Sequence, residues 1–406
     1  SRVQDKMNLY KYLNRLRPVI LINISKNTYT NKYTDKKLFT PGPLLTTPRV
    51  KNAMLRDLGS RDDEFIQIIK YVQNKLLEIA GVSSLDFTAV LMQGSGTFGV
   101  ESVLQTTTKQ NESKILVLEN GAYGQRIQKM CKLLSLDHKV LSFPEERSID
   151  LNVLNSFLQD ENNFTHVAVI HGETTSGALN KVEQIGQMVK KYIPDSIFIV
   201  DSMSAFGAVP VDFKKGSIDF LVSSSNKCIQ SVPGFSFVIC SIKKLLSCKN
   251  NSKSLSLDLV DQYENMVKTN QFRFTPPTHA ILAFKEALVE LEEEGGPVKR
   301  YERYSNNHEI VRNGLLSIGF KELVPYDEQS KIINSYFYPN DSNFSFEKFY
   351  KMLSDRGMVI YPGKMSKASC FRIGNIGDLY SKDMEKLVGD IKQVLQEMNV
   401  KIPIQN

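Results

Sequence analysis

The stretch DFLVSSSNKCIQSVPGFSF, residues 219–237, places one lysine in a turn between two apolar runs. The runs DFLVSS and FSFVIC lie only about ten residues apart, which is too close for a helical crossover and predicts an antiparallel pair of strands. Lys227 lies between them, next to Ser225 and Asn226 and without a charged neighbour. A loop lysine is normally a solvated surface charge, so these surroundings indicate a different role.

Other apolar runs precede this stretch: FTAVLM (87–92), KILVLEN (114–120), HVAVIH (166–171) and SIFIVD (196–201). Amphipathic segments, such as 122–134 and 180–192, separate them. Near-continuous apolar strands alternating with helices are typical of a mostly parallel sheet that helices cover on both faces. The sequence therefore predicts an α/β fold.

The pattern changes after about residue 285. Long charged helices follow, then strand candidates at 331–338, 357–362 and 370–376, and a closing helix near 381–398. This order predicts a smaller α+β domain. We expect three parts, namely a basic arm (1–38), a large α/β domain (39–285) and a small α+β domain (286–406).

The net charge of +7 is confined to the arm. Residues 1–38 hold nine basic and two acidic side chains, so the rest of the chain is neutral. The body therefore lacks a basic field that would attract nucleic acid, and we expect no nucleic-acid partner. The arm is a phosphate-binding tail, a transit sequence, a linker remnant or an extension without catalytic duty.

The numbers and spacing of cysteines and histidines indicate the redox compartment and whether a metal site is expected. Its five cysteines form no metal-ligand spacing and their odd number does not suit a disulfide framework, which favours a reducing, cytoplasmic compartment. The five histidines are scattered, so no metal site is expected. No run approaches the length of about 20 apolar residues that a membrane helix needs.

A glycine-rich loop supports two different hypotheses. QGSGTFGVES holds Gly94, Gly96 and Gly99 in the G-x-G-x-x-G spacing, after a strand and at the start of a helix, and Glu119 ends the next strand. This matches a dinucleotide-binding fingerprint and hence a nicotinamide-dependent dehydrogenase. The underlying physics is broader, because any such helix N-terminus binds a phosphate. The turn alone, with nothing bound, is the third possibility.

Three further strand ends carry reactive side chains. Asp201 ends SIFIVD; Glu173, Thr174 and Thr175 come just after HVAVIH; and Lys227 comes after DFLVSS. Ligands of open α/β sheets bind beyond these carboxyl ends. A lysine, a carboxylate and a phosphate site in one crevice match pyridoxal phosphate, whose aldehyde needs an amine and whose ring nitrogen needs an acid. Lys227 is then the Schiff-base lysine, and Asp201 pairs with the ring nitrogen unless it merely caps a helix.

The motifs resemble the class-V aminotransferases of fold type I, and in particular their phosphonate-specific branch. The matching stretches run in order from about residue 38 to the C-terminus and include LFTPGPLLTTPRV, LMQGSGTFGVES, ENGAYGQR, HGETTSGALN, IVDSMSAFGAVPVD, SSSNKCIQSVPGFSFVI, RFTPPTHAILAF and CFRIGNIG. The resemblance implies a seven-stranded sheet, pyridoxal phosphate as the cofactor and a homodimer.

The resemblance also assigns roles to individual residues. It implies that Ser95, Gly96 and Thr97 bind the phosphate, with Asn226 or Ser225 assisting. Tyr123 would stack on the ring, and Thr174 would face its phenolic oxygen. Thr275 would reach the phosphate in the neighbouring subunit. Arg372 would bind the anionic end of the substrate, for which a planar guanidinium is suited.

The activity implied is transfer of the amino group of 2-aminoethylphosphonate to pyruvate, giving phosphonoacetaldehyde and L-alanine. Another class-V aminotransferase, acting on alanine or serine with glyoxylate or pyruvate, is the nearest alternative. A cysteine desulfurase is disfavoured because Cys370 lies on a probable strand rather than a mobile loop.

Overall fold

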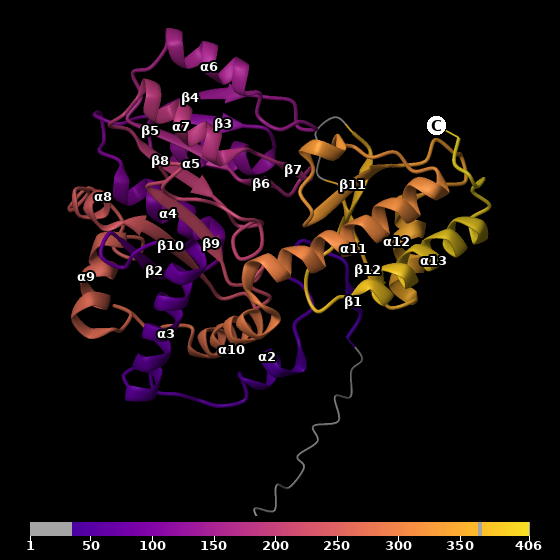
Figure 1. The fold of residues 1–406 in the computed structure, drawn as a ribbon, viewed down its shortest axis with the longest axis horizontal. Helices are drawn as coiled ribbons and strands as arrows, with labels where there is room; N and C mark the ends of the chain where they lie inside the picture. Colours follow the sequence, from indigo (N-terminus) through magenta and orange to yellow (C-terminus); the bar gives the residue numbers. More distant parts are fainter. Residues whose placement is uncertain (1–34, 364–367, 406) are drawn as a thin grey trace, which may run out of the picture. The chain divides into compact units, whose positions relative to one another are not determined.

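The computed structural model describes residues 35–363 and 368–405, so nearly all of the predicted basic arm lies outside the described residues. A seven-stranded sheet has the order β2-β10-β9-β8-β5-β3-β4 (Figure 1). Neighbouring strands are parallel except where β10 pairs antiparallel with β2 and β9. The predicted mostly parallel sheet and the antiparallel β9–β10 pair are confirmed. The strands are β2 (Phe87–Gln93), β3 (Lys114–Glu119), β4 (Asp137–Ser142), β5 (His166–Ile170), β8 (Ile197–Asp201), β9 (Phe220–Ser224) and β10 (Phe235–Ser241).

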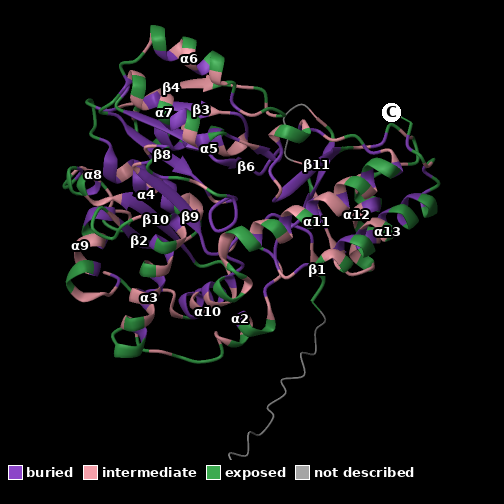
Figure 2. Ribbon diagram, in the orientation of Figure 1, coloured by how far each residue is buried: buried purple, intermediate pink, exposed green. Residues whose placement is uncertain are grey.

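The central strands form where apolar runs can be buried on both faces. Every residue of β5, β8 and β9 is buried (Figure 2). Strand β4 was missed by the sequence analysis because DHKVLS mixes polar and apolar residues. It lies at the edge of the sheet beside β3, and its residues are only half-buried or exposed. An edge position does not require an apolar run.

Helices connect these strands, and several begin at an aspartate. The side chains of Asp62, Asp150 and Asp258 accept hydrogen bonds from first-turn N–H groups of α3, α6 and α9, which stabilises each helix start. The short strands β6 (Gly172–Glu173) and β7 (Ala178–Leu179) form a separate hairpin after β5. The helices of this part are α2 (Pro48–Asn52), α3 (Asp63–Ala80), α4 (Gly96–Thr107), α5 (Ala122–Leu133), α6 (Leu151–Asp160), α7 (Val182–Tyr192), α8 (Ile242–Leu246), α9 (Leu259–Thr269) and α10 (Thr278–Glu294).

The elements after α10 build a smaller α+β part, as predicted. Its antiparallel sheet has the order β11-β14-β13, and residues such as Val311, Phe371 and Leu387 form a core separate from that of the large sheet. Its elements are α11 (Gly296–Ile318), η1 (Tyr326–Glu328), β11 (Ile333–Phe337), α12 (Phe346–Asp355), β12 (Met358–Val359), β13 (Tyr361–Pro362), β14 (Cys370–Gly374) and α13 (Ser381–Glu397).

The limits of the three domains stay a prediction. Residue 285 lies inside α10, whose Leu288 and Leu291 belong to the larger core. At the other limit, β1 (Lys37–Leu38) pairs in parallel with β12, and Phe39 packs in the smaller core. The chain therefore contacts the C-terminal part before it crosses to the large sheet.

The described part of the chain also bears on environment. All five cysteines are buried free thiols. No helix within residues 35–363 and 368–405 is long and apolar enough to cross a bilayer. The same residues contain no group of three or more His, Cys, Asp or Glu side chains arranged to hold a metal ion.

Candidate active site

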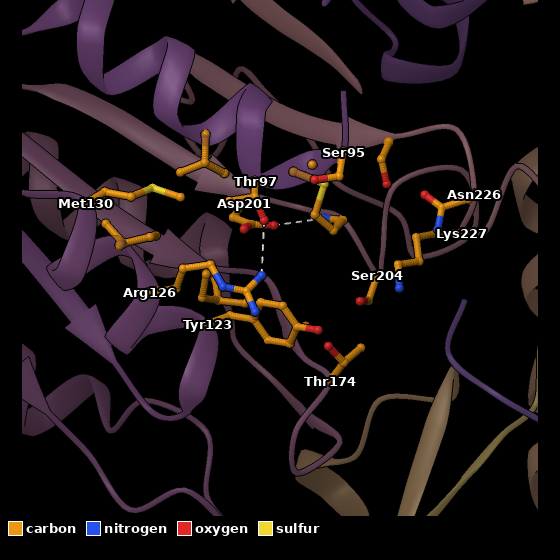
Figure 3. Close-up of a pocket in the computed structure, with 17 residues that line it drawn as sticks. Ser95, Thr97, Tyr123, Arg126, Met130, Thr174, Asp201, Ser204, Asn226 and Lys227 are labelled. Atoms are coloured by element: carbon orange, nitrogen blue, oxygen red, sulfur yellow. Dashed lines mark hydrogen bonds between the residues drawn. The ribbon is translucent and has the colours of Figure 1, made fainter. Parts of the chain in front are cut away.

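One cavity of about 220 Å³ lies beyond the carboxyl ends of β2, β5, β8 and β9 (Figure 3). Because parallel strands end at the same edge of a sheet, residues far apart in sequence meet there. The residues predicted from the sequence that line this cavity are Ser95, Gly96, Thr97, Tyr123, Thr174, Asp201, Asn226 and Lys227.

The turn between β2 and the start of α4 lines the cavity through Ser95, Gly96 and Thr97. Gly94 has a φ of 95°, a conformation that favours glycine. A Cβ at Gly96 would lie 2.3 Å from the sulfur of Met203, so the helix start approaches this side chain closely only as glycine. No side chain caps the N-terminus of α4. Its partial positive charge, with Ser95 and Thr97 beside it, suits a phosphate group.

The topology excludes the dinucleotide-binding hypothesis. The fingerprint requires a βαβ unit of parallel strands. Within the described sheet, β2 is an edge strand whose neighbour is the antiparallel β10, and four strands separate it from β3. Glu119 at the end of β3 packs against Gly124 of the following helix. It therefore does not serve a ligand at Gly94, and the dehydrogenase hypothesis is wrong.

Lys227 reaches the cavity from the turn after β9. Its ammonium group donates hydrogen bonds to the carbonyl oxygens of Pro41 (2.9 Å) and Gly42 (3.1 Å). Gly42 has a φ of 109°, and a Cβ there would lie 2.8 Å from Cδ of Lys227. The segment around Gly42 thus covers the lysine closely, and its glycine is required for that contact.

Burial shifts the pKa values of Lys227 and Asp201 toward each other. It raises the pKa of Asp201 to about 6, although the N–H of Met203, 3.1 Å from Oδ1, and the charges of Arg126 and Lys227 favour the carboxylate. It lowers the pKa of Lys227 to about 8, assisted by Arg372 and opposed by Asp201. The sequence left open whether Asp201 merely caps the segment that follows it. Asp201 does accept this capping hydrogen bond from the N–H of Met203, and it also lines the cavity. Shifts of this kind are typical of groups that exchange protons near neutral pH.

A buried glutamate positions Tyr123. The backbone N–H of Tyr123 donates to Oε2 of Glu173 at 3.2 Å, and the other carboxylate oxygen accepts from the N–H of Thr175 at 3.1 Å. Burial raises the pKa of Glu173 to about 7, against the effect of these hydrogen bonds. Glu173 thereby ties the start of α5 to the loop after β5, and the Tyr123 ring faces the cavity (Figure 3). The sequence places Glu173 at this strand end, but no role in the site was predicted for it.

Arg372 lies on β14, adjacent to the cavity rather than in its lining. Its Nη1 donates to the carbonyl oxygen of Thr174 at 2.7 Å, and its Nε donates to that of Pro362 at 3.0 Å. Burial lowers the pKa of Arg372 below its ordinary value. The guanidinium therefore has a fixed position beside Thr174, which lines the cavity.

Two predicted cofactor residues do not line the cavity. Ser225 is fully buried and donates its hydroxyl to the carbonyl oxygen of Val232 at 2.7 Å, so it braces the lysine turn. Thr275 is exposed and lies between α9 and α10. Its carbonyl oxygen accepts a hydrogen bond from the Gln93 side chain.

Several lining residues were missed, of which Arg126 is the most informative. Its Nη1 donates to the hydroxyl of Thr97 at 3.2 Å, and its guanidinium lies 4.6 Å from the centre of the Tyr123 ring. A spacing of three in a predicted helix places Tyr123 and Arg126 on one face, which was a usable signal. The other missed polar or sulfur-containing residues are Met130, Met203, Ser204 and Ser224.

The alternative based on Cys370 fails on its environment. Cys370 is buried in β14, and burial raises the pKa of its thiol to about 11. A nucleophilic cysteine needs a lowered pKa and access to its substrate. The expectation that this residue is not a desulfurase nucleophile therefore agrees with its position.

Comparison with known proteins gives consistent relatives. The family model described as aminotransferase class-V matches residues 48–375. A 2-aminoethylphosphonate–pyruvate transaminase of Lysinibacillus sphaericus is 46% identical over 363 residues, which cover 89% of this chain and 98% of that protein. A bifunctional phosphonoacetaldehyde hydrolase/aminoethylphosphonate transaminase of Clostridioides difficile is 43% identical over 380 residues, or 93% of this chain. The chain spans 59% of the length of that bifunctional protein.

Solved structures share the fold. Alanine–glyoxylate aminotransferase of Nostoc sp. superposes with a TM-score of 0.82 at 22% identity, covering 90% of this chain and 96% of that one. Pyridoxamine–pyruvate aminotransferase of Mesorhizobium loti gives 0.82 at 21% identity, with 91% and 95% covered. With the match of the family model to most of the sequence, the chain belongs to the class-V aminotransferase family of pyridoxal phosphate enzymes.

Proposed function

We propose that the protein transfers the amino group of 2-aminoethylphosphonate to pyruvate, giving phosphonoacetaldehyde and L-alanine. The relatives named as transaminases of this phosphonate, at 43 and 46% identity over most of the chain, support this substrate. The observation that carries the reaction type is Lys227, a lysine with a lowered pKa in one cavity with Asp201 and the start of α4.

The residues of the cavity fit pyridoxal phosphate. We assign the phosphate to the N–H groups at the start of α4 with Ser95 and Thr97, and the ring to the space between Tyr123 and Asp201. Thr174 and Asn226 add further polar groups to the lining. When bound, the cofactor supplies an aldehyde that takes up the amino group and a ring that accepts the electrons released at the substrate carbon.

Lys227 has two tasks in this proposal. It holds the cofactor covalently between turnovers, and its neutral amine accepts and returns the proton at the carbon that carries the amino group. The pKa of about 8 makes the neutral amine available near neutral pH. Asp201 supplies a negative charge that keeps the ring nitrogen protonated, which favours electron uptake by the ring.

Arg372 is the proposed site for the anionic end of both substrates. A guanidinium binds a phosphonate or a carboxylate with paired hydrogen bonds. Hydrogen bonds to the carbonyl oxygens of Thr174 and Pro362 fix the orientation of the guanidinium. It therefore favours substrates whose anionic group lies at that fixed position. The phosphonate and the pyruvate carboxylate would occupy the same place in the two halves of the reaction.

We further propose a homodimer in the cytoplasm. Thr275 is exposed and outside the cavity of its own chain, which is the placement expected if it serves the phosphate of the neighbouring subunit. Five buried free thiols suit a reducing compartment.

The test is a spectrum of the purified protein followed by donor competition. We expect cofactor absorbance that borohydride fixes to Lys227, and conversion of 2-aminoethylphosphonate with pyruvate at a kcat/KM at least about tenfold above that for alanine or serine with glyoxylate. Activity with those donors and none with the phosphonate would reject the substrate and retain the reaction type. Labelling of a lysine other than Lys227 would reject the site.

A further inference from the structure

Arg303 of α11 uses every N–H group of its guanidinium on the protein. Its Nε donates to Oε1 of Glu294 at 2.7 Å, and Nη2 donates to Oε1 of Gln230 at 2.7 Å and Oε2 of Glu294 at 3.3 Å. Nη1 donates to the carbonyl oxygens of Gly377 at 2.9 Å and Leu379 at 3.0 Å. With all five donors engaged, Arg303 has none left for a ligand.

The acceptors of Arg303 belong to two loops that carry proposed active-site groups. Gln230 lies three residues after Lys227, is buried, has a φ of 63°, and donates its N–H to the carbonyl oxygen of Lys227 at 2.8 Å. Gly377 and Leu379 follow β14, the strand of Arg372. Arg303 therefore joins the lysine turn to the end of the strand that holds Arg372.

Neighbouring residues on the same face of α11 contact the same two loops. Arg300 donates through Nη1 to the carbonyl oxygen of Cys228 at 2.8 Å, and the hydroxyl of Tyr304 donates to Oε1 of Gln230 at 2.6 Å. Asn307 donates to the carbonyl oxygens of Asn375 and Leu379. Positions 300, 303, 304 and 307 share one face of a helix, where apolar residues would otherwise pack.

Glu294 holds the side chains of Arg300 and Arg303 in place by pairing with both. It is the last residue of α10, where the helix dipole disfavours a carboxylate. It nevertheless pairs with Arg300 and Arg303, and burial raises its pKa while these cations lower it, with a net lowering. The Arg303 guanidinium also lies 4.9 Å and 5.0 Å from the ring centres of Tyr304 and Tyr380.

We propose that Arg303 is a positioning residue that holds the Lys227 turn and the Arg372 strand at a fixed separation. The inference rests on the proposed function, because the separation matters only if a substrate reacts near Lys227 while Arg372 binds its anionic end. A guanidinium can hold the carboxylate of Glu294, the amide of Gln230 and two carbonyl groups at once. Lysine keeps the charge but has three donors on one nitrogen and cannot satisfy that set.

The experiment compares Arg303→Lys with Arg312→Lys. Arg312 lies on the same helix, pairs with Glu322 at 3.0 Å and lies 4.2 Å from the Tyr326 ring centre, but touches neither loop. Amide hydrogen exchange is measured in peptides covering 225–234 and 375–380. We expect exchange to be about tenfold faster in both peptides for Arg303→Lys and unchanged for Arg312→Lys. Faster exchange in one peptide alone, or equal effects of both variants, would overturn the proposal.

A second measurement tests the consequence for the site. Ethylamine has the carbon chain of 2-aminoethylphosphonate without the anion, so its reaction with the cofactor depends on Lys227 and not on Arg372. The reaction of each amine with the cofactor is followed by absorbance. We expect Arg303→Lys to weaken the reaction of the phosphonate donor about tenfold relative to that of ethylamine, while borohydride still labels Lys227 fully. Equal losses for both amines would overturn the positioning role. Failure of the wild-type protein to prefer the phosphonate would instead reject the proposed function, and the exchange result would stand apart from it.

Discussion

Asp201 and Lys227 face one cavity from the ends of the neighbouring parallel strands β8 and β9, with pKa values of about 6 and about 8. Between these values the carboxyl group is mostly ionised, and the amine, still mostly protonated, has a pKa below that of an ordinary lysine. Within the described residues Asp201 accepts from the N–H of Met203 and Lys227 donates to the carbonyl oxygens of Pro41 and Gly42, so the two groups form no direct ion pair. Each is thus available to a ligand placed between them, which is the arrangement that a pyridine ring bonded to the lysine requires.

Replacing Asp201 by asparagine removes the charge that we expect to keep the ring nitrogen protonated. We predict that Asp201→Asn lowers kcat/KM at least about a hundredfold, because preorganised charges of this kind contribute that much to catalysis. Steady-state kinetics with 2-aminoethylphosphonate and pyruvate measure it. Asp219→Asn is the matched control, since Asp219 pairs with Lys190 at 2.8 Å, lies at the opposite end of β9 and does not line the cavity. Asp201→Asn activity within about threefold of wild type would contradict the assignment.

Glu173 predicts a pH dependence of stability in the cofactor-free protein. Its pKa rises from 4.5 in the unfolded chain to about 7 in the folded one. Between these values the folded state retains a proton that the unfolded state has lost, so the free energy of unfolding falls as the pH rises. The decrease reaches up to about 3 kcal/mol and ends above about pH 7. Asp201 acts in the same direction between 3.8 and about 6.

Urea unfolding at pH 5 and pH 7.5 checks this dependence. Glu173→Gln cannot ionise, so we expect its stability to change less between the two pH values than that of the wild type, by about 2 kcal/mol. The exposed Glu112→Gln serves as the control and should follow the wild type. The same pH dependence in Glu173→Gln and wild type would show that this carboxyl group does not hold its proton in the fold.

The sequence was informative about strands and strand ends. Continuous apolar runs predicted the buried strands, and Lys227 and Asp201 stood out because each follows such a run. What it did not predict depends on contacts between distant segments. Pro41 covers Lys227 from 186 positions away, and the roles of Glu173 and Arg303 follow from packing that no local pattern encodes. Edge strand β4 was missed because an edge needs no apolar run.

A substitution at Gly96 tests the turn between β2 and α4, to which we assign the phosphate. A Cβ there would meet the sulfur of Met203 at 2.3 Å and its methyl group at 2.7 Å, and Met203 lines the cavity. Gly96→Ala should push this flexible side chain into the cavity and weaken cofactor binding about tenfold, which corresponds to about 1.4 kcal/mol. Absorbance titration of the cofactor-free protein measures the change.

Shortening Met203 should reverse that loss. We expect the double variant Gly96→Ala, Met203→Ala to bind the cofactor more tightly than Gly96→Ala alone, because the two positions are coupled through direct contact. Gly389→Ala is the control, since a Cβ at Gly389 meets nothing within 4 Å. A double variant no better than the single one would place the effect in the backbone of α4 instead.

Thr275 provides the test of a shared active site. If it serves the neighbouring subunit, a Lys227→Ala chain and a Thr275→Asp chain should each be inactive alone, the latter because aspartate repels the phosphate. A mixed dimer contains one intact site, built from Lys227 of the second chain and Thr275 of the first. Coexpression in equal amounts should therefore restore about a quarter of the wild-type activity, given random pairing of two-fold dimers.

The control for this complementation pairs two lesions that lie in one chain's cavity. Lys227 and Asp201 line the same cavity, so mixing Lys227→Ala with Asp201→Asn leaves every site with one defect and should restore nothing. Recovery only in the mixture that contains Thr275→Asp assigns Thr275 to the site across the interface. If Lys227→Ala and Thr275→Asp fail to complement although gel filtration shows mixed dimers, Thr275 acts within its own chain or not at all. Its exposure would then need an explanation that does not involve the cofactor.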